Sequence, residues 1–506
     1  MANTVFDSLK RITNVTTTDN GAVAKKSTLD AVYDMFAFGG AYRNHTDADC
    51  QLLFKKAYQE DPTLAIKCLF YLRDILQGQG ERRFFRTCYQ WLAKNDAEMA
   101  IRNLIHIAEF GRYDDLIYAT INTPIEDVAF DMVAAQLKLD RDCKTPSLLA
   151  KWVPSCNASA KTTIATGNKL RKHMGLTHKE YRKMLSELRT KINIVEKLMS
   201  ENRWDEIEFD KLPSIAGLKY RNAFARRDVI KKKYETFAKD TETKVNAKAM
   251  FPYEVVRTAI NKLGWSSTFI GDDTERAMIN KYWENIPDFL NGSDENIMCV
   301  VDTSGSMTCG GYSAKPIDVA ISLGLYAAQR NTGAFANHYI SFSSRPQFIE
   351  CEGIDFCDTV ARIYRTNLCE NTNLDAVFDL LFNAVTKQGA NKTDLPSRLV
   401  VISDMQIDEG AKPGWGDDCW FPAWTEDNAA MNMENIRKKW AAAGLELPKL
   451  YYWNVNAQNP VIIDSGDDVT FVSGCSPVLF EGVCKGITGK ALCLEKLNSD
   501  RYKEIY

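Results

Sequence analysis

The spacing of apolar residues changes near residue 290, and this change limits the fold of the 506-residue chain more than any other feature. Before it, apolar side chains recur at three- and four-residue steps, which is typical of amphipathic helices. After it, short apolar or β-branched runs alternate with helical stretches, the pattern of strands joined by helices. We therefore expect an N-terminal segment over 1–27, a helical module over 28–290 and an α/β domain over 291–506.

Several amphipathic stretches predict the helical module. Gly78 and Gly80 separate a helix over 62–76 from a second helix that begins at Arg82, and the two should form a hairpin. The clearest helix is predicted over 178–200, where an apolar face lies opposite a basic one. Short helices joined by short turns over such a length fit an irregular, HEAT-like helical-repeat solenoid.

The α/β domain is predicted from its alternation of strands and helices. Strands are expected over 297–301, 338–342, 399–402, 450–453 and 469–472, with helices over 317–330, 374–385 and 432–443 between them. Such alternation favours a mainly parallel sheet with helices on both faces, a doubly wound, Rossmann-like architecture.

Charge is distributed unevenly along the chain. Residues 1–290 contain 45 Lys and Arg against 38 Asp and Glu, whereas residues 291–506 contain 18 against 28. The basic excess is concentrated in residues 141–200, which contain 13 basic and 4 acidic side chains. This excess indicates an anionic partner for the helical module, with an ordinary solvated helix surface as the alternative.

Composition narrows the class of protein further. No apolar run approaches the length of about 18 residues that a membrane span needs, and the N-terminus lacks the pattern of a secretory signal. We expect a cytoplasmic protein that binds no membrane and whose 14 cysteines stay reduced. The chain has no G-x-S-x-G motif, and Ala491 after Gly489-Lys490 departs from a phosphate-binding P-loop, so no enzyme is expected.

Oxygen-bearing side chains gather where predicted strands end. Asp302-Thr303-Ser304-Gly305-Ser306 follows the first strand of the α/β domain, and Asp404 follows the third. Thr372, just before a predicted helix, is expected at the same edge. Carboxylates and hydroxyls without nitrogen or sulfur donors suit Mg²⁺ or Mn²⁺. The alternative is a polar loop that binds no metal.

This set resembles the metal-ion-dependent adhesion site of von Willebrand factor type A domains, whose pattern is D-x-S-x-S, a distant Thr and a distant Asp. The resemblance implies that Ser304, Ser306 and Thr372 bind the metal directly, whereas Asp302 and Asp404 act largely through water. The open metal position would attract a carboxylate or phosphate from a partner.

A helical module followed by such a domain is similar to the Ro autoantigen (TROVE) ribonucleoproteins. Phrases such as Leu72-Arg73-Asp74-Ile75, Ser147-Leu148-Leu149-Ala150-Lys151-Trp152 and Lys219-Tyr220-Arg221-Asn222-Ala223-Phe224 also resemble a related group from plants, bacteria and large viruses. In Ro proteins the helical repeats close into a ring, which binds RNA ends and structured RNA. The resemblance thus implies a non-catalytic RNA-binding protein.

The resemblance places RNA contacts in the basic excess. Candidates are Lys161, Lys169, Arg171, Lys172, His173, Arg182 and Lys183, with Arg82, Arg83 and Arg86 as a second patch. For the second patch, a structural role between helices is an equal alternative, and His173 also fits a helix surface. Two other hypotheses for the whole chain are a metal-dependent scaffold, whose protein partner supplies an acidic residue, and a purely structural ring.

Overall fold

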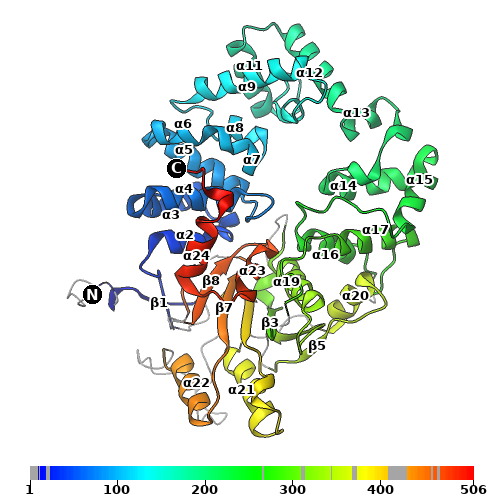
Figure 1. Ribbon diagram of the computed structural model, residues 1–506. Coiled ribbons are helices and arrows are strands. Elements are labelled where there is room, and N and C mark those ends of the chain that lie inside the picture. Colours follow the sequence, from blue (N-terminus) through cyan, green and yellow to red (C-terminus); the bar gives the residue numbers. More distant parts are fainter. Residues whose placement is uncertain are drawn as a thin grey trace. The chain divides into compact units, whose positions relative to one another are not determined.

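The computed structural model describes residues 10, 12–18, 23–264, 267–293, 295–308, 314–342, 345–366, 373–407, 430–456, 460–463 and 468–506. Contacts divide the chain into two compact units (Figure 1). We call residues 1–45 and 251–496 the α/β unit, and residues 46–250 and 497–506 the helical unit. The predicted combination of a helical region and a C-terminal α/β region is confirmed at this level.

The α/β unit is built around one six-stranded sheet with the order β5-β4-β3-β6-β7-β8. Its strands are β3 (Ile297–Asp302), β4 (His338–Phe342), β5 (Phe348–Glu350), β6 (Arg398–Ser403), β7 (Lys449–Asn454) and β8 (Val469–Ser473). All neighbours are parallel except β5, which pairs antiparallel with β4. β3 and β6 are buried along their whole length, as expected for central parallel strands.

The strand order fixes where the helices of the sheet lie. The chain moves from β3 to β4 on one side and from β6 through β7 to β8 on the other. Because crossovers between parallel strands are right-handed, the two directions place their helices on opposite faces. The helices are α18 (Gly305–Thr308), α19 (Pro316–Arg330), α20 (Phe356–Thr366), α21 (Leu374–Thr386), α22 (Ala430–Ala442), α23 (Phe480–Cys484) and α24 (Gly489–Leu497). The order reverses between β3 and β6, and ligands bind at such points in doubly wound sheets.

Residues before 290 also belong to this unit, which differs from the predicted division at 290/291. Helix α2 (Ala31–Gly39) packs on β8, and the Phe471 N–H donates a 2.9 Å hydrogen bond to the Tyr33 hydroxyl. A Cβ at Gly40 would lie 2.6 Å from the Ser473 carbonyl oxygen, so the close approach of helix and strand requires glycine. The predicted boundary follows the change in periodicity, whereas the packing extends across it.

Two further helices, α16 (Pro252–Ile260) and α17 (Asp273–Glu284), pack on α19 and α20 in the α/β unit. Arg276 of α17 donates two hydrogen bonds, of 2.6 and 2.8 Å, to the Asp355 carboxylate before α20. Trp283 stacks on Phe356 with 4.2 Å between ring centroids. The hairpin of β1 (Val15–Thr17) and β2 (Val23–Lys25) also belongs here, and no strand was predicted for it.

The helical unit consists of short helices joined by short turns. They are α3 (Asp47–Glu60), α4 (Pro62–Arg73), α5 (Arg82–Asn95), α6 (Ala97–Asn103), α7 (Ile107–Phe110), α8 (Tyr113–Tyr118), α9 (Glu126–Asp142), α10 (Leu149–Trp152), α11 (Lys161–His173), α12 (His178–Ile192), α13 (Val195–Ser200), α14 (Ser214–Arg226) and α15 (Asp228–Lys239). The predicted hairpin of α4 and α5 is present, because these helices pack together. No described helix of the chain has the length and apolar content of a membrane span.

The predicted single helix over 178–200 is wrong, because the structure has two helices, α12 and α13. Thr177 begins α12 with a capping box, since its hydroxyl accepts from the Glu180 N–H and the Glu180 carboxylate accepts from the Thr177 N–H. Asn193 ends it in the left-handed conformation, with φ of 55°. Asn tolerates this conformation better than most residues, so the helix stops although the apolar spacing continues.

Candidate functional site

The predicted metal residues lie at the point where the strand order reverses. Asp302 ends β3, Ser304 and Ser306 lie in the turn and short helix that follow, and Asp404 directly follows β6, the parallel neighbour of β3. Ser304 and Ser306 oxygens lie 3.1 Å apart, and the Ser304 N–H donates to the Asp302 carboxylate over 2.8 Å. The structure thus brings Asp302, Ser304 and Ser306 together as predicted from their spacing.

Burial and charge shape the chemistry of this cluster. Asp302 is fully buried, and Asp404 is 2 % exposed. Burial, followed by the nearby Asp404 charge, raises the pKa of Asp302 to about 7, although hydrogen bonds from Ser403 and Ser304 oppose the shift. Two buried carboxylates with hydroxyls beside them would gain from a cation, so this donor set fits Mg²⁺ or Mn²⁺.

Other parts of the predicted metal site are not described. Thr372 lies outside the described residues. Among the described residues, no group of three or more His, Cys, Asp and Glu side chains is placed to hold a metal ion. The set at β3 and β6 contains only two such residues, because its other members are hydroxyls.

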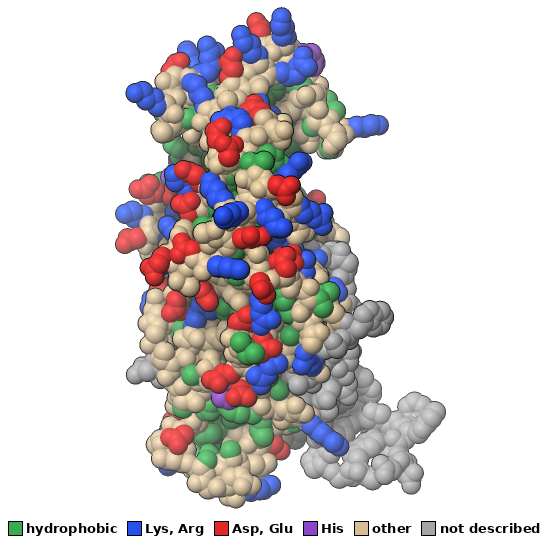
Figure 2. Space-filling view, turned by 90° about the vertical axis from the view of Figure 1, so that its right-hand side faces the viewer, with side chains coloured by type: hydrophobic (Ala, Val, Ile, Leu, Met, Phe, Trp, Pro, Cys, Tyr) green, Lys and Arg blue, Asp and Glu red, His purple; other side chains and the backbone are tan. Residues whose placement is uncertain are grey.

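The basic candidates lie on α11 and α12, where Figure 2 shows Lys and Arg side chains gathered at the top of the view. Several have protein partners. Lys169 donates to the Glu126 carboxylate over 2.8 Å, and a His173 ring nitrogen lies 2.8 Å from the Asp131 carboxylate. Arg171 donates to the Leu176 carbonyl over 2.6 Å. These contacts favour structural roles for the three side chains. For His173, this agrees with the alternative that it is a residue of the helix surface.

The remaining candidates on these helices face solvent. Lys161, Lys172, Arg182 and Lys183 are exposed. Lys183 lies 3.9 Å from the Glu187 carboxylate, a long and exposed pair that contributes little. Lys179 is a further exposed cation that sequence reasoning missed, although it follows the capping residue Thr177 in the basic stretch. These cations form what we call the α11–α12 surface: Lys161, Lys172, Lys179, Arg182 and Lys183.

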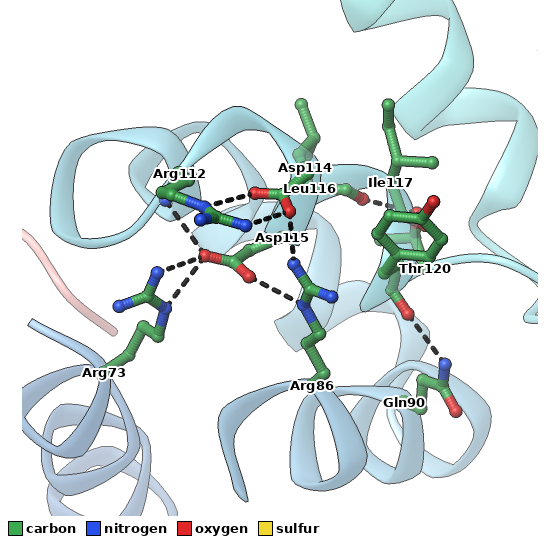
Figure 3. Close-up of polar contacts among 10 residues, drawn as sticks. Arg73, Arg86, Gln90, Arg112, Asp114, Asp115, Leu116, Ile117 and Thr120 are labelled. Carbon is green, nitrogen blue, oxygen red and sulfur yellow. Dashed lines mark hydrogen bonds and ion pairs between the residues drawn. The ribbon is translucent and has the colours of Figure 1, made fainter. Parts of the chain in front are cut away.

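Of the second predicted patch, Arg86 belongs to a polar network between helices (Figure 3). Arg86 donates to Asp115 over 2.7 Å and to Asp114 over 2.8 Å. Arg82 and Arg83 are both exposed, and Arg83 pairs with Asp47 over 2.5 Å. For Arg86, the structure therefore favours the alternative interpretation, a bridge from α5 to α8.

A pocket of about 530 Å³ opens beside α12, in the helical unit. Its lining includes Arg182 and Lys183, which the sequence predicted as RNA contacts. It also includes three cations that the sequence did not predict as RNA contacts, Lys179, Arg189 and Lys197. Arg189 and Lys197 stand among the non-apolar positions of the predicted 178–200 helix. Their position beside the apolar face of the predicted helix was the sequence signal that could have identified them. A basic residue at such a position can line a groove as well as face solvent.

Most of the chain matches known protein families. Residues 18–118 and 125–293 match a family described as "Domain of unknown function (DUF2828)", and together they make up more than half of the chain. The chain belongs to the DUF2828 family. Residues 296–486 match a second family, "Domain of unknown function (DUF7788)". The change from the DUF2828 match to the DUF7788 match coincides with the change in apolar periodicity near residue 290.

Two individual proteins extend this comparison beyond the DUF2828 region. "Uncharacterized protein L728" of Acanthamoeba polyphaga mimivirus is 28 % identical over 513 residues, covering 92 % of this chain and 84 % of that protein. The crystal structure of the Deinococcus radiodurans RO (RSR) protein is similar with a TM-score of 0.51 and 14 % identity. The similarity covers 91 % of this chain and 100 % of the Deinococcus chain, so the likeness concerns the fold of both units.

Proposed function

We propose that this chain is a non-catalytic RNA-binding protein of the Ro ribonucleoprotein type, which binds RNA through the α11–α12 surface. The observation that carries the proposal is the set of exposed cations on this surface, of which only Lys183 pairs with a carboxylate among the described residues. Such a surface attracts the phosphates of a nucleic-acid backbone. The fold likeness to a Ro protein over nearly the whole chain supports this proposal.

The α11–α12 surface suits contacts to the RNA backbone. Lysine and arginine side chains on helices reach phosphate oxygens without reading sequence, and RNA helices are recognised largely by shape and backbone. The predicted candidates Lys169, Arg171 and His173 have protein partners of their own. We therefore assign the main phosphate contacts to Lys161, Lys172 and Arg182.

A binding titration tests the proposal. Purified protein is titrated with RNA duplexes that carry or lack a 3′ single-stranded tail, at two salt concentrations. We expect binding that weakens steeply with salt, since each neutralised phosphate releases counterions. The variant Lys161→Ala with Lys172→Ala should bind less tightly and reduce the salt slope by about 2.

A matched control removes the same charge elsewhere in the helical unit. Lys55 and Lys56 are both exposed on α3, so Lys55→Ala with Lys56→Ala tests for a general effect of net charge. Equal losses in the two double variants would contradict the assignment to α11. No binding to either RNA at low salt would contradict the proposed function.

The second part of the proposal concerns the α/β unit, which we assign to the von Willebrand factor type A fold. Its doubly wound sheet and the cluster of Asp302, Ser304, Ser306 and Asp404 support the assignment. Mg²⁺ or Mn²⁺ would be held by these residues with Thr372, and it would supply a Lewis acid that attracts an anionic group. The HEAT-like description of the helical unit belongs to the same proposal.

Metal binding is tested by titration calorimetry. We expect Mg²⁺ to bind one site in the full chain and to raise the melting temperature, because the ion binds only the folded cluster. Asp302→Asn with Ser304→Ala should abolish both effects, whereas Thr332→Ala, a hydroxyl change in a loop of the same unit, should not. Unchanged Mg²⁺ binding in the cluster variant would contradict this site.

The alternative of a metal-dependent protein scaffold without RNA binding is not favoured, since the fold likeness supports the Ro type. It makes a different prediction in the same experiments. A scaffold would capture a protein partner only with metal present and would leave RNA free. EDTA-sensitive capture together with absent RNA binding would replace our proposal with this one.

A further inference from the structure

The pocket beside α12 has a more specific chemistry than the surface around it. It is formed by the loop that contains Ser155, by one side of α12 and by Lys197 of α13, all within the helical unit. Its volume of about 530 Å³ lies in the range of small-molecule sites, and it is much larger than a single phosphate group needs. This volume leaves room for a nucleotide as well as its phosphate.

The lining of the pocket is cationic. Lys179, Arg182, Lys183, Arg189 and Lys197 line it, and no Asp or Glu is among the described lining residues. Nearby carboxylates neutralise only part of this charge, because Glu201 pairs with Lys197 at 2.8 Å and Glu187 lies 3.9 Å from Lys183. Lys179 and Arg182 add positive charge that these pairs do not offset.

One wall of the pocket is fixed before any ligand binds. The Arg189 guanidinium donates to the Ala150 carbonyl over 2.8 Å, to the Ser155 hydroxyl over 2.9 Å and to the Val153 carbonyl over 3.0 Å. A guanidinium has five N–H donors, so two remain beyond these three bonds. Tyr181 is a buried residue of the lining, and its hydroxyl donates to the Pro154 carbonyl over 2.9 Å. The anchored Arg189 is thus a preorganised donor, which lowers the entropic cost of binding.

We infer that this pocket binds the terminal phosphate of an RNA strand, together with its nucleotide. The inference rests on the proposed function and specifies which part of the RNA enters. A terminal phosphate monoester carries a charge of about −1.5 to −2 at neutral pH and has three free oxygens. An internal phosphodiester carries a single negative charge and continues on both sides, so it suits an open surface better than a pocket. Arginine donors match the oxygens of the monoester in a forked geometry.

The test compares short single-stranded RNAs of one sequence that end in a 5′-phosphate, a 3′-phosphate or hydroxyls at both ends. Binding to the full-length protein is measured by fluorescence anisotropy with an internal label. We expect one of the phosphorylated RNAs to bind about tenfold more tightly than the hydroxyl-ended RNA, the gain of a charge-assisted hydrogen bond. A nucleoside monophosphate should compete with it, whereas the matching nucleoside should not.

Matched variants locate the effect. Lys179→Gln with Arg182→Gln removes two exposed pocket cations and should bring the ratio of affinities close to one. Lys161→Gln with Lys172→Gln removes two charges from α11 outside the pocket lining, so both RNAs should weaken and the ratio should persist. Thermal melts of each variant verify that the fold is retained, and Lys179→Gln alone serves if the double variant does not fold.

The outcomes separate the inference from the proposed function. Equal affinities for phosphorylated and hydroxyl-ended RNA would overturn the pocket assignment and leave RNA binding intact. A pocket variant that keeps its preference for the phosphorylated RNA would overturn the pocket assignment as well. Failure of every RNA to bind would overturn both proposals, even if a nucleoside monophosphate alone binds.

Discussion

Asp115 of α8 is hydrogen-bonded to side chains of α4 and α5. Its fully buried carboxylate accepts hydrogen bonds from Arg73, over 2.8 and 2.6 Å, from Arg86 over 2.7 Å and from the Arg112 N–H over 2.9 Å. Arg73 is itself 1 % exposed. Asp115→Ala would leave this guanidinium buried without its carboxylate, and we expect a loss of about 3–5 kcal/mol in the free energy of unfolding.

Urea unfolding followed by circular dichroism measures this loss. The control is Glu98→Ala, which removes the carboxylate of an exposed pair with Arg102 at 2.5 Å. Exposed pairs contribute little, so the control should change the free energy by less than about 1 kcal/mol. Similar effects of the two substitutions would mean that the Asp115 network does not stabilise the helical unit.

Glu254 gives the α/β unit a pH dependence. Its carboxylate accepts a 2.9 Å hydrogen bond from the Phe251 N–H at the start of α16. Burial raises the pKa of Glu254 to about 7, although the Phe251 N–H and the Arg43 charge act in the opposite direction. Because the folded state holds a proton that the unfolded state releases near pH 4.5, stability falls as pH rises from about 4.5 to 7.

The neutral variant Glu254→Gln should therefore remove this part of the pH dependence. We expect similar melting temperatures for variant and wild type near pH 5, and a higher one for the variant above pH 7, by the equivalent of about 2 kcal/mol. Glu284→Gln, at the end of α17, is a carboxylate control in the same unit. Parallel melting curves for wild type and Glu254→Gln across this pH range would contradict the prediction.

At the scale of elements, the sequence predicted the strands and helices that have a clear local pattern of apolar residues. The five predicted strands are present because central parallel strands are continuous apolar runs, as in β6, which is buried throughout. The three residues of β5 are too short for such a pattern, and their pairing with β4 is a tertiary contact. In the same way, the predicted strand ends located Asp302 and Asp404 at one edge of the sheet. The ion pairs of Lys169 and Arg86 could not be predicted locally, because their carboxylate partners lie on other helices.

The C-terminal segment 497–506 is an element that packs where its sequence position did not predict. It was expected in the α/β domain, but it belongs to the helical unit. Tyr502 is 2 % exposed and stacks on Phe110, with 5.4 Å between ring centroids. Arg501 donates to Asp74 over 2.9 Å and to Glu109 over 2.9 Å. The segment thus packs against Phe110 and the helices on either side of it.

Tyr502→Ala should destabilise the helical unit by about 3–5 kcal/mol, the cost of removing a large buried aromatic side chain. Hydrogen exchange of the full-length protein measures it, with faster exchange expected over α4 and α7. Tyr506→Ala is the control, because this side chain is 58 % exposed and its contact with Asn103 uses the backbone. Unchanged exchange in Tyr502→Ala would show that the segment is not part of the core.

At the scale of the whole molecule, the chain folds across the division that its sequence and its family matches indicate. The family match changes between residues 293 and 296, and net charge changes sign there too. The α/β unit nevertheless takes its helices α2, α16 and α17 from the first part of the chain. The contacts of these helices with the sheet and its helices include buried apolar side chains. Phe36 of α2 and Val256 of α16, for example, are almost fully buried.

These contacts lead to a prediction about fragments. If residues 1–290 and 291–506 are produced together as separate chains, they should stay associated through α2 on β8 and α16 on α19. Because buried apolar surface does not weaken with salt, the pair should co-elute in gel filtration at 1 M NaCl, where the Debye length falls to about 3 Å. Fragment 291–506 alone should aggregate, since it exposes the faces of β8 and α19 that these helices cover. Fragments that separate at high salt but associate at low salt would instead assign their association to the opposite charges of the two parts.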